Sequence, residues 1–392
     1  MKILSVNAGS SSLKFQLYEM PEENVLISGV FERIGIGNSF YTIKLNGEKI
    51  KKEVELEDHK QAFQILVQEL MDNKVIESCD EVKAIGHRTV QGGEKYDHTV
   101  EIDEDVIQDM VTYSSLAPLH NPAAITGIRA AQEVFKDAMQ TAVFDTAFHA
   151  TIAKVNYIYP VPYEWYTEYG VRKYGMHGTS HRFVSQRVNE ILGRNDTKVI
   201  TCHIGNGASI SAVMNGKCID TSMGLTPNAG VMMGSRCGDI DCSIVPYIME
   251  KTGMSTKEID TALNKNSGLL GVSGVSSDSR DVENGIQEGN ERCILAQEMY
   301  VRRIIHYISM YFVEMGGADA IVFTAGVGEN SIATRKQIVD GLSALGIQLD
   351  EEANNCRGKE TLISNENSSV KCYVIPTDEE LMIARDTYEL AK

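Results

Sequence analysis

The chain has 392 residues, of which 43% are hydrophobic and 23% are charged, so it has the composition of a globular protein and the length of two domains. Its formal net charge of −17 argues against binding to nucleic acid or to an anionic membrane, because both need a basic surface. No apolar run approaches the roughly 20 residues of a membrane span, and the N-terminus lacks the shape of a signal peptide. The eight cysteines are scattered without a CxxC pair, which is typical of reduced thiols, so we expect a cytoplasmic protein.

The first element is a short apolar strand at residues 3–6, which runs into Asn-Ala-Gly-Ser-Ser-Ser-Leu-Lys at 7–14. The chain then continues in a strand-like pattern to about residue 18, so a strand–turn–strand hairpin is predicted. Gly9 lets the backbone approach a ligand closely, while backbone N–H groups, serine hydroxyls and Lys14 can all face an anion. The segment therefore predicts a phosphate cradle, with a plain hairpin turn as the alternative.

The rest of the first half alternates helices with strands. Helices are expected at residues 59–73, 103–113 and 121–138, and strands at 81–86 and 140–144. Asn121 is the expected cap of the third helix, with Pro122 at its first position. Between residues 145 and 172 the chain is rich in tyrosine and proline, which indicates a connection and places a domain boundary near residues 145–150.

The second half repeats the opening pattern. An apolar strand runs into Gly205-Asn206-Gly207 and continues as a strand, so residues 198–220 form a second predicted hairpin. Each half also has a later strand that leads into a glycine loop, at 84–93 and at 320–330. This repetition predicts an internal duplication, with the loops of two similar lobes converging on a ligand-binding cleft. The spacing of a Walker loop is absent.

The remaining elements of the second half complete an α/β pattern. A long glycine-containing loop is expected at residues 224–238, and a last strand at 370–375. Thr377 is the expected cap of the final helix. Helices are expected at residues 178–192, 239–251, 255–263, 291–315, 331–345 and 378–391.

Several charged residues lie where they could contact an anionic substrate. Arg88 and Arg236 lie in glycine-rich surroundings, and the planar guanidinium suits a carboxylate or a phosphate. His177 lies at a glycine-flanked helix start, where backbone N–H groups favour an anion. His177 and His181 are four residues apart, but no third ligand is evident, so a phosphoryl contact is favoured over zinc. The polar loop at 278–281 could bind a ribose or a base.

Three acids follow predicted strands. Asp145 comes after the strand at 140–144, and Asp378 and Glu379 come after the strand at 370–375. Carboxylates at strand ends are natural magnesium ligands, often through water. The alternative for Asp378 and Glu379 is that they only stabilise the N-terminus of the final helix.

Together these residues resemble the acetate kinase family over essentially the whole chain. The matching segments are residues 7–14, 86–88, 117–122, 144–149, 177–181, 203–207, 230–234, 326–330 and 376–380. The resemblance implies the two-lobed α/β fold with duplicated ribonuclease H-like lobes around a central cleft, which actin, Hsp70 and sugar kinases share. It implies an N-terminal lobe of residues 1–147, completed by the C-terminal helix at about 380–392, and a nucleotide-binding lobe of residues 148–379.

The activity that the resemblance implies is reversible transfer of the γ-phosphate of ATP to acetate, giving acetyl phosphate and ADP. The transfer would be direct and in line, with Mg²⁺, or Mn²⁺ in its place, as the metal. The family's members are typically homodimers, so the resemblance implies a homodimer here. No nucleic acid or membrane partner is expected.

On the acyl side, the resemblance implies that Arg88 binds the carboxylate of the substrate. Val90, Leu119, Met176 and Pro227 match the small apolar pocket around its methyl group. Met176 stands where phenylalanine is common in the family, so the preferred length of the acyl chain is open. Propionate kinase or butyrate kinase is therefore the nearest alternative function.

On the phosphoryl side, the resemblance implies that Asn7 and Glu379 hold the metal. Asp145 is the expected active-site acid, while His177 and Arg236 would stabilise the transferring phosphoryl group. The expected nucleotide contacts are Lys14, His203, Ile204, Gly205, Asn206, Gly207, Asp278, Ser279, Arg280, Gly326, Val327, Gly328, Glu329 and Asn330.

The sequence departs from the family pattern at further positions. Gln91 replaces a frequent histidine, and Asn228-Ala229 replaces a usual Leu-Glu pair. Two other kinds of protein use a related fold. One is a nucleotide-gated chaperone or filament protein, and the other is an enzyme that hydrolyses polyphosphates. An assay for acyl phosphate separates both from a kinase.

Overall fold

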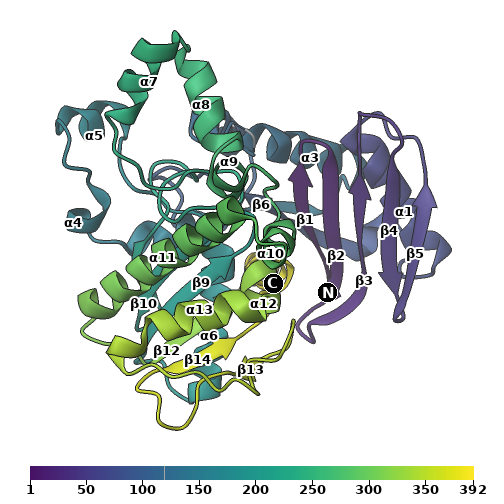
Figure 1. The fold of residues 1–392 in the computed structure, drawn as a ribbon. Helices are drawn as coiled ribbons and strands as arrows, with labels where there is room; N and C mark the ends of the chain where they lie inside the picture. Colours follow the sequence, from purple (N-terminus) through teal and green to yellow (C-terminus); the bar gives the residue numbers. More distant parts are fainter. Residues whose placement is uncertain (119) are drawn as a thin grey trace. The chain divides into compact units, whose positions relative to one another are not determined.

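The structure is a computed structural model that describes residues 1–118 and 120–392 (Figure 1). The chain divides into two compact units. Unit 1 consists of Met1–Phe148 with Asp378–Lys392, and unit 2 consists of His149–Thr377. No helix among the described residues combines the length and the apolar character that crossing a membrane requires.

Unit 1 contains an eight-stranded sheet in the order β5-β4-β3-β2-β1-β6-β8-β7. Strands β1, β6 and β8 run parallel, while β1 to β5 form an antiparallel meander and β7 pairs antiparallel with β8. The strand bounds are β1 Lys2–Gly9, β2 Ser12–Glu19, β3 Asn24–Glu32, β4 Phe40–Leu45, β5 Glu48–Glu53, β6 Val82–Thr89, β7 Val100–Glu101 and β8 Met139–Phe144.

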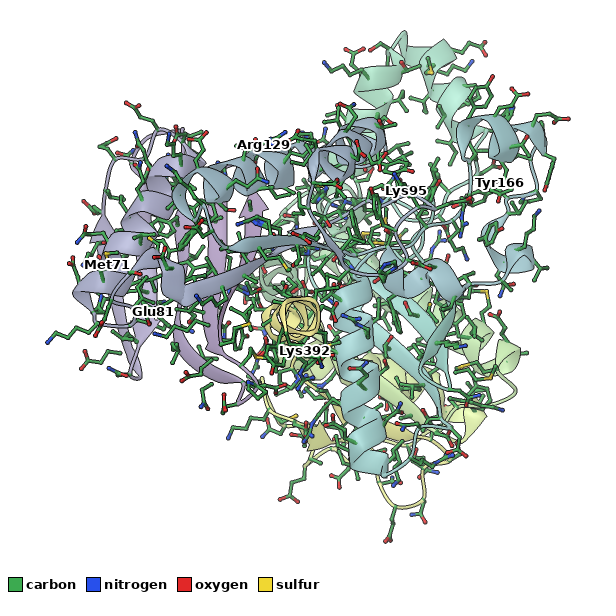
Figure 2. All side chains as sticks on the ribbon, turned by 180° about the vertical axis from the view of Figure 1, so that it is seen from behind. Met71, Glu81, Lys95, Arg129, Tyr166 and Lys392 are labelled. Atoms are coloured by element: carbon green, nitrogen blue, oxygen red, sulfur yellow. The ribbon has the colours of Figure 1, made fainter. Side chains whose placement is uncertain are left out.

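Helices cover both faces of this sheet. Successive side chains of a strand point to opposite faces. Leu4 and Val6 of β1 therefore join the core cluster beneath α1 and α3, whereas Ile3 packs with Ala384 of the C-terminal helix α14. Lys392 follows that helix as its C-cap (Figure 2). The helix bounds are α1 His59–Asp72, α2 Glu104–Thr112, α3 Asn121–Val134 and α14 Glu379–Ala391.

Unit 2 contains a six-stranded sheet in the order β11-β10-β9-β12-β14-β13. Its first five strands match β3-β2-β1-β6-β8 of unit 1 in order and in direction, with two antiparallel pairs followed by two parallel pairs. The two sheets thus show the predicted duplication. The bounds are β9 Lys198–Ile204, β10 Ala208–Met214, β11 Lys217–Thr221, β12 Ala320–Thr324, β13 Thr361–Leu362 and β14 Lys371–Val374.

The helices of unit 2 also lie on both faces of its sheet. Helix α6 packs on β9 and β12 from one side, and α11 and α13 cover the other side (Figures 1 and 2). The bounds are α4 Lys154–Tyr157, α5 Glu164–Tyr169, α6 Gly178–Leu192, α7 Ile244–Thr252, α8 Thr256–Lys265, α9 Gly268–Ser273, α10 Ser279–Gln287, α11 Glu291–Glu314, α12 Ala325–Asn330 and α13 Ile332–Gly341.

Two segments that were predicted as glycine loops belong at least in part to a strand and to a helix. Strand β6 does not end at Gly86 but continues through Arg88 to Thr89, because its backbone pairs with β1 as far as His87 and with β8 as far as Thr89. Gly86 is needed within the strand, since a Cβ there would lie 2.2 Å from Thr387 Oγ1 of α14. Residues 326–330 belong to α12, so the prediction of a loop after β12 was wrong.

The other local corrections concern the residues at which helices begin and the residues that cap them. Asn121 is not a cap but the first residue of α3, and its buried side chain bonds to the backbone of Gln91. The final helix is capped by Asp378 instead of Thr377. The polar loop predicted at 278–281 is the start of α10, with Asp278 as its N-cap. Helix α7 begins at Ile244, five residues later than predicted from residue 239.

Candidate functional site

The opening hairpin of unit 1 places Asn7 and Lys14 opposite each other. They are partners in the register of β1 and β2, which the pair Gly9–Ser12 closes. Lys14 Nζ lies 2.5 Å from Glu380 Oε1 at the start of α14, and the lysine side chain is 56% exposed. The hairpin and the N-terminus of α14 therefore present an amide, a mobile ammonium group and a carboxylate together.

Arg88 is the centre of an ion-pair cluster in unit 1. Its Nη2 donates to Asp145 Oδ2 over 2.6 Å and its Nε to Asp145 Oδ1 over 3.3 Å, which is a bidentate arrangement. Its Nε also lies 3.6 Å from Glu379 Oε2. Because Arg88 pairs with Val143 near the end of β6 and Asp145 follows the neighbouring β8, the sheet itself fixes this pair. A guanidinium held in this way is oriented so that it can bind a further carboxylate.

The acids around Arg88 outnumber the bases. Burial raises the pKa of Asp145 and of Glu379, and the charge of Arg88 opposes that shift at both. Asp378 at the N-cap of α14 and Glu380 on its first turn add two more carboxyl groups, with Lys14 as the second cation. This excess of oxygen donors suits a divalent cation that also takes oxygens from a substrate phosphate, as Mg²⁺ usually does. No cluster of three or more acidic, histidine or cysteine side chains that could hold a metal alone occurs among residues 1–118 and 120–392.

The residues predicted for the acyl pocket belong to both units, and each is described within its own unit. Val90, directly after β6, is 5% exposed in unit 1. Leu119 lies outside the described residues. Met176 of unit 2 is 2% exposed, and Pro227 of the same unit accepts a long contact of 3.5 Å from Arg236 Nη1 through its carbonyl oxygen. Pro227 is therefore next to the arginine that was predicted to bind phosphate.

His177 and Arg236 converge on Gly207 in unit 2. A Cβ on Gly207 would lie 3.3 Å from Arg236 Nη1 and 3.7 Å from His177 Nε2. His177 takes the N-cap position of α6 with φ of 60°, and its ring stacks on His203 with 4.1 Å between centroids. Burial lowers the pKa of Arg236, although a guanidinium stays charged at neutral pH. Two donors thus face the turn that follows β9.

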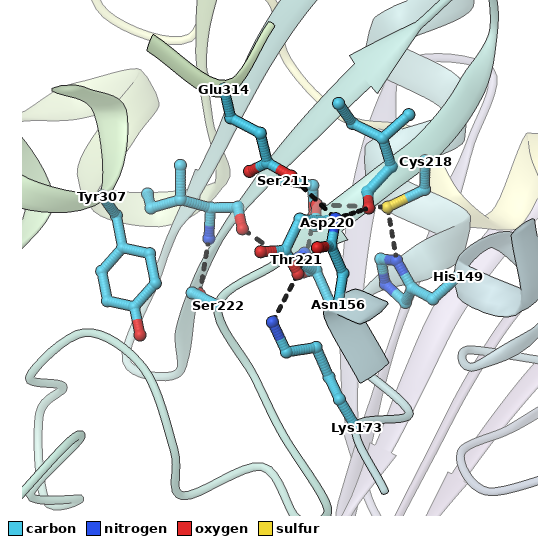
Figure 3. Close-up of polar contacts among 12 residues, drawn as sticks. His149, Asn156, Lys173, Ser211, Cys218, Asp220, Thr221, Ser222, Tyr307 and Glu314 are labelled. Atoms are coloured by element: carbon cyan, nitrogen blue, oxygen red, sulfur yellow. Dashed lines mark hydrogen bonds and ion pairs between the residues drawn. The ribbon is translucent and has the colours of Figure 1, made fainter. Parts of the chain in front are cut away.

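Buried hydroxyls hold these histidines in place. His177 Nδ1 lies 2.9 Å from Ser209 Oγ, and His203 Nδ1 lies 2.8 Å from Ser180 Oγ. His149 Nε2 lies 3.0 Å from the carbonyl oxygen of Met176. Its Nδ1 lies 3.1 Å from Cys218 Sγ (Figure 3). Burial lowers the pKa of His149 to about 4, so this support is neutral.

The loop that carries Arg236 is tied to the long helix α11. Asp239 accepts from the N–H of Gly230 over 2.8 Å through Oδ1, and from the hydroxyl of Tyr307 through Oδ2. The backbone N–H of Asp239 returns a bond to the carbonyl oxygen of Gly230. These bonds close the loop between residues 230 and 239, so Arg236 sits on a fixed support.

A cavity of about 570 Å³ lies beside the Gly205-Asn206-Gly207 turn. The turn is held against Gly234, whose N–H donates to the carbonyl oxygen of Asn206 over 2.9 Å. Gly234 has no room for a side chain, since a Cβ would lie 1.9 Å from Asn206 Oδ1. The predicted nucleotide residues that line the cavity are Gly205, Asn206, Asp278, Ser279, Arg280, Gly326, Val327 and Asn330.

Three residues that were predicted to contact the nucleotide have structural roles. Ile204 is fully buried in β9. The carbonyl oxygen of Gly328 accepts from Arg335, and Glu329 Oε1 accepts from the N–H of Ala325 over 2.8 Å, which closes the turn of α12. The structure therefore gives Gly328 and Glu329 a role in shaping the wall of the cavity.

Several residues of the site were not predicted. Glu283, Tyr300, Ser331 and Arg357 line the cavity, and Ser209 contacts His177. The four cavity residues come from α10, α11, the N-cap of α13 and a loop, which are far apart in the chain, so no local pattern could have joined them. Only Ser209 had a signal, because hydroxyls alternate with apolar residues along β10.

Comparisons with known proteins agree over the whole chain. A model of the acetokinase family matches residues 2–385. The chain is 55% identical over 392 residues to a protein of Geobacillus kaustophilus named acetate kinase, covering 100% of this chain and 99% of that one.

Two solved structures match the fold along its full length. Acetate kinase from Porphyromonas gingivalis gives a TM-score of 0.93 at 46% identity and covers 100% of both chains. A propionate kinase from Francisella tularensis gives a TM-score of 0.94 at 42% identity and covers 99% of both. The chain thus has the two-lobed α/β fold of these two proteins.

Proposed function

Because this chain belongs to the acetokinase family, we propose that it is an acetate kinase, which transfers the γ-phosphate of ATP reversibly to acetate. The observation that carries the proposal is the turn at Gly205-Asn206-Gly207. Gly205 and Asn206 of this turn line the 570 Å³ cavity, and Gly207 lies beside Arg236 and His177. Cationic and N–H donors beside a nucleotide-sized cavity are what stabilisation of a transferring phosphoryl group needs.

The acceptor needs no general base. Acetate is ionised at neutral pH, unlike the hydroxyl acceptor of a sugar kinase, so attack on phosphorus releases no proton. The protein must instead compensate the negative charge of both substrates. Arg88 is assigned to the acetate carboxylate, and Arg236 and His177 to the phosphoryl oxygens. Asp145 orients Arg88 through two hydrogen bonds, and its assigned role is electrostatic.

A pH–rate profile of the transfer step tests that role of Asp145. The proposal predicts that Asp145→Asn lowers kcat at every pH without deleting a limb of the profile. The role is wrong if the wild-type profile has a carboxylate limb that vanishes in Asp145→Asn while the affinity for Mg²⁺ is unchanged.

The metal assigned to this site is Mg²⁺, with Mn²⁺ as its substitute. Asn7 and Glu379 would hold it, and Lys14 would contact the nucleotide phosphates. The excess of carboxylates around Arg88 supports this assignment. When bound, the cation neutralises charge on the phosphates. Asp145 and Glu379 also keep Arg88 oriented, so loss of either changes the acetate site as well as the metal site.

Hydroxylamine trapping of acyl phosphate tests the proposed function directly. We expect hydroxamate from acetate and ATP, with kcat/KM highest for acetate among acetate, propionate and butyrate. One methylene in an apolar pocket changes the discrimination between two substrates by only about 1–3 kcal/mol. We therefore expect the predicted pocket with Met176 to accept propionate as a secondary substrate. A higher kcat/KM for propionate or butyrate establishes the alternative function, and phosphate release from polyphosphate without hydroxamate contradicts a kinase.

We also propose a cytoplasmic homodimer. The family resemblance supports the dimer, as do the large apolar side chains that unit 2 leaves exposed, such as Val155, Trp165 and Tyr169. The eight cysteines, all free, support a reducing compartment. Light scattering at micromolar concentration should give twice the mass of 43.3 kDa, and the mass of one chain would contradict the dimer.

A further inference from the structure

A continuous chain of buried polar contacts ends at His177. Thr201 Oγ1 of β9 lies 2.7 Å from His181 Nδ1, and His181 Nε2 lies 2.7 Å from Ser209 Oγ of β10. Ser209 Oγ in turn lies 2.9 Å from His177 Nδ1. Thr201, His181 and Ser209 are fully buried, so these contacts are made without bulk water.

The direction of the donors along this chain follows from its first member. The Thr201 hydroxyl has one proton and two neighbours, His181 Nδ1 at 2.7 Å and the carbonyl oxygen of Ser211 at 3.4 Å. A contact of 3.4 Å is too long for a good O–H···O bond, so the proton goes to His181 Nδ1. Burial lowers the pKa of His181 well below its usual value. The ring is therefore neutral, and its proton lies on Nε2.

The remaining donors are then fixed in order. His181 Nε2–H donates to Ser209, whose single hydroxyl proton is left to donate to His177 Nδ1. A neutral His177 whose Nδ1 accepts a bond must carry its own proton on Nε2. Nε2 is the nitrogen that lies toward Gly207 and Arg236.

We propose that Ser209 is a positioning residue that holds neutral His177 in the tautomer with its proton on Nε2. This inference rests on the proposed function for the role of His177. In that tautomer the imidazole donates a hydrogen bond to a phosphoryl oxygen without first becoming an imidazolium. The bond from His149 to the carbonyl oxygen of Met176 fixes the backbone just before His177.

The kinetic test compares two serines of one strand. Ser209→Ala should lower kcat about 10- to 100-fold while the KM values for ATP and acetate stay within about threefold. Ser211→Ala is the matched control, because Ser211 is also fully buried in β10 but its hydroxyl pairs with Thr221 Oγ1 at 2.7 Å (Figure 3). It should keep the wild-type kcat. Equal losses in both variants would show a merely structural role and overturn the proposal.

The pH profile gives a second readout. Wild-type kcat should stay level as pH rises above about 7, because neutral His177 keeps the donor on Nε2. In Ser209→Ala the neutral ring is free to move its proton to Nδ1, so kcat should fall as pH rises. A level profile in Ser209→Ala would contradict the proposal.

The tautomer itself is observable without any assay of activity. The protein has nine histidines, which ¹⁵N labelling makes visible in long-range ¹H–¹⁵N spectra, and His177→Gln identifies the signals of His177. Above about pH 8 we expect a protonated Nε2 and a bare Nδ1 in the wild type, and a mixture in Ser209→Ala. Thr201→Val, which is nearly isosteric, removes the first donor and should give the same mixture if Ser209→Ala does not fold.

Two results separate this inference from the proposed function. If the spectra change as expected but the wild type makes no acyl phosphate, the tautomer assignment stands and the acetate kinase proposal fails. If the wild type is an acetate kinase whose His177 carries its proton on Nδ1, the inference is wrong and the function stands.

Discussion

Arg88 shows what a residue gains from lying inside a strand. Its backbone is paired with Val143 of β8, and its guanidinium is held by both oxygens of Asp145, so few side-chain conformations remain to be lost when a substrate binds. Arg88→Ala should therefore raise the KM for acetate at least about tenfold while the KM for ATP changes less than about threefold. Initial rates with each substrate varied in turn measure both constants.

Arg129 provides the matched control for Arg88. It is an exposed arginine on α3, paired with Glu104 in the same unit (Figure 2). Arg129→Ala should leave both KM values unchanged. The assignment of Arg88 to the carboxylate is wrong if Arg88→Ala leaves the KM for acetate unchanged or raises that for ATP by the same factor.

His87, next to Arg88, should make stability depend on pH. Burial lowers its pKa to about 4, although its Nε2 bonds to Gln140 Oε1. The folded protein thus binds fewer protons than the unfolded chain, so stability falls as pH drops from about 6.5 toward about 4. Between pH 7.5 and pH 5, His87 alone should account for about 2 kcal/mol of that loss.

Urea unfolding of wild type and His87→Gln at those two pH values measures the effect. The free energy of unfolding of the variant should fall less, because one buried histidine no longer takes up a proton on unfolding. His149 and His181 remain in the variant and keep part of the slope. Equal losses in the two proteins would contradict the assignment to His87.

At the scale of elements, the loop at 224–238 depends on its anchor to α11. Tyr307→Phe removes the hydroxyl that donates to Asp239 and should loosen the support of Arg236. We expect kcat to fall about 3- to 30-fold with little change in the KM for ATP, because misplacement of a charged group by a fraction of an ångström is costly in transfer reactions.

Tyr311, one turn further along α11, is the control for Tyr307. It is fully buried, and its hydroxyl has no hydrogen-bond partner among the described residues. Tyr311→Phe should therefore keep the wild-type kcat. A normal kcat in Tyr307→Phe, or equal losses in both variants, would show that the anchor does not position Arg236.

The sequence predicted elements well where the signal was local. The two hairpins, the strand β12 and the long helix α11 follow from runs of apolar residues and their period. Residues 326–330 were predicted as a loop because two glycines favour one, yet Glu329 accepts from the N–H of Ala325 and closes a helical turn. The meander β3–β5 was not predicted at all, since its strands are partly exposed and mixed in character.

In the whole molecule, the internal duplication could be predicted from the sequence because both units keep the same strand–turn–strand hairpin. Strand order and direction agree between the two sheets although few residues repeat. The roles of Arg88, His177 and Arg236 came from family motifs and stay a proposal. The series of side-chain contacts from Thr201 to His177 could not be predicted, because it joins two strands and a helix through single contacts.

The most direct test of phosphoryl transfer from ATP to acetate is a ³¹P NMR spectrum of the protein with ATP, acetate and Mg²⁺. An acetate kinase makes acetyl phosphate and ADP in equal amounts, and makes ATP from acetyl phosphate and ADP in the reverse mixture, so we expect both results. Arg236→Ala should slow both directions by the same factor, because one transition state serves both. Free phosphate without acetyl phosphate, at any ratio of substrates, would contradict an acetate kinase.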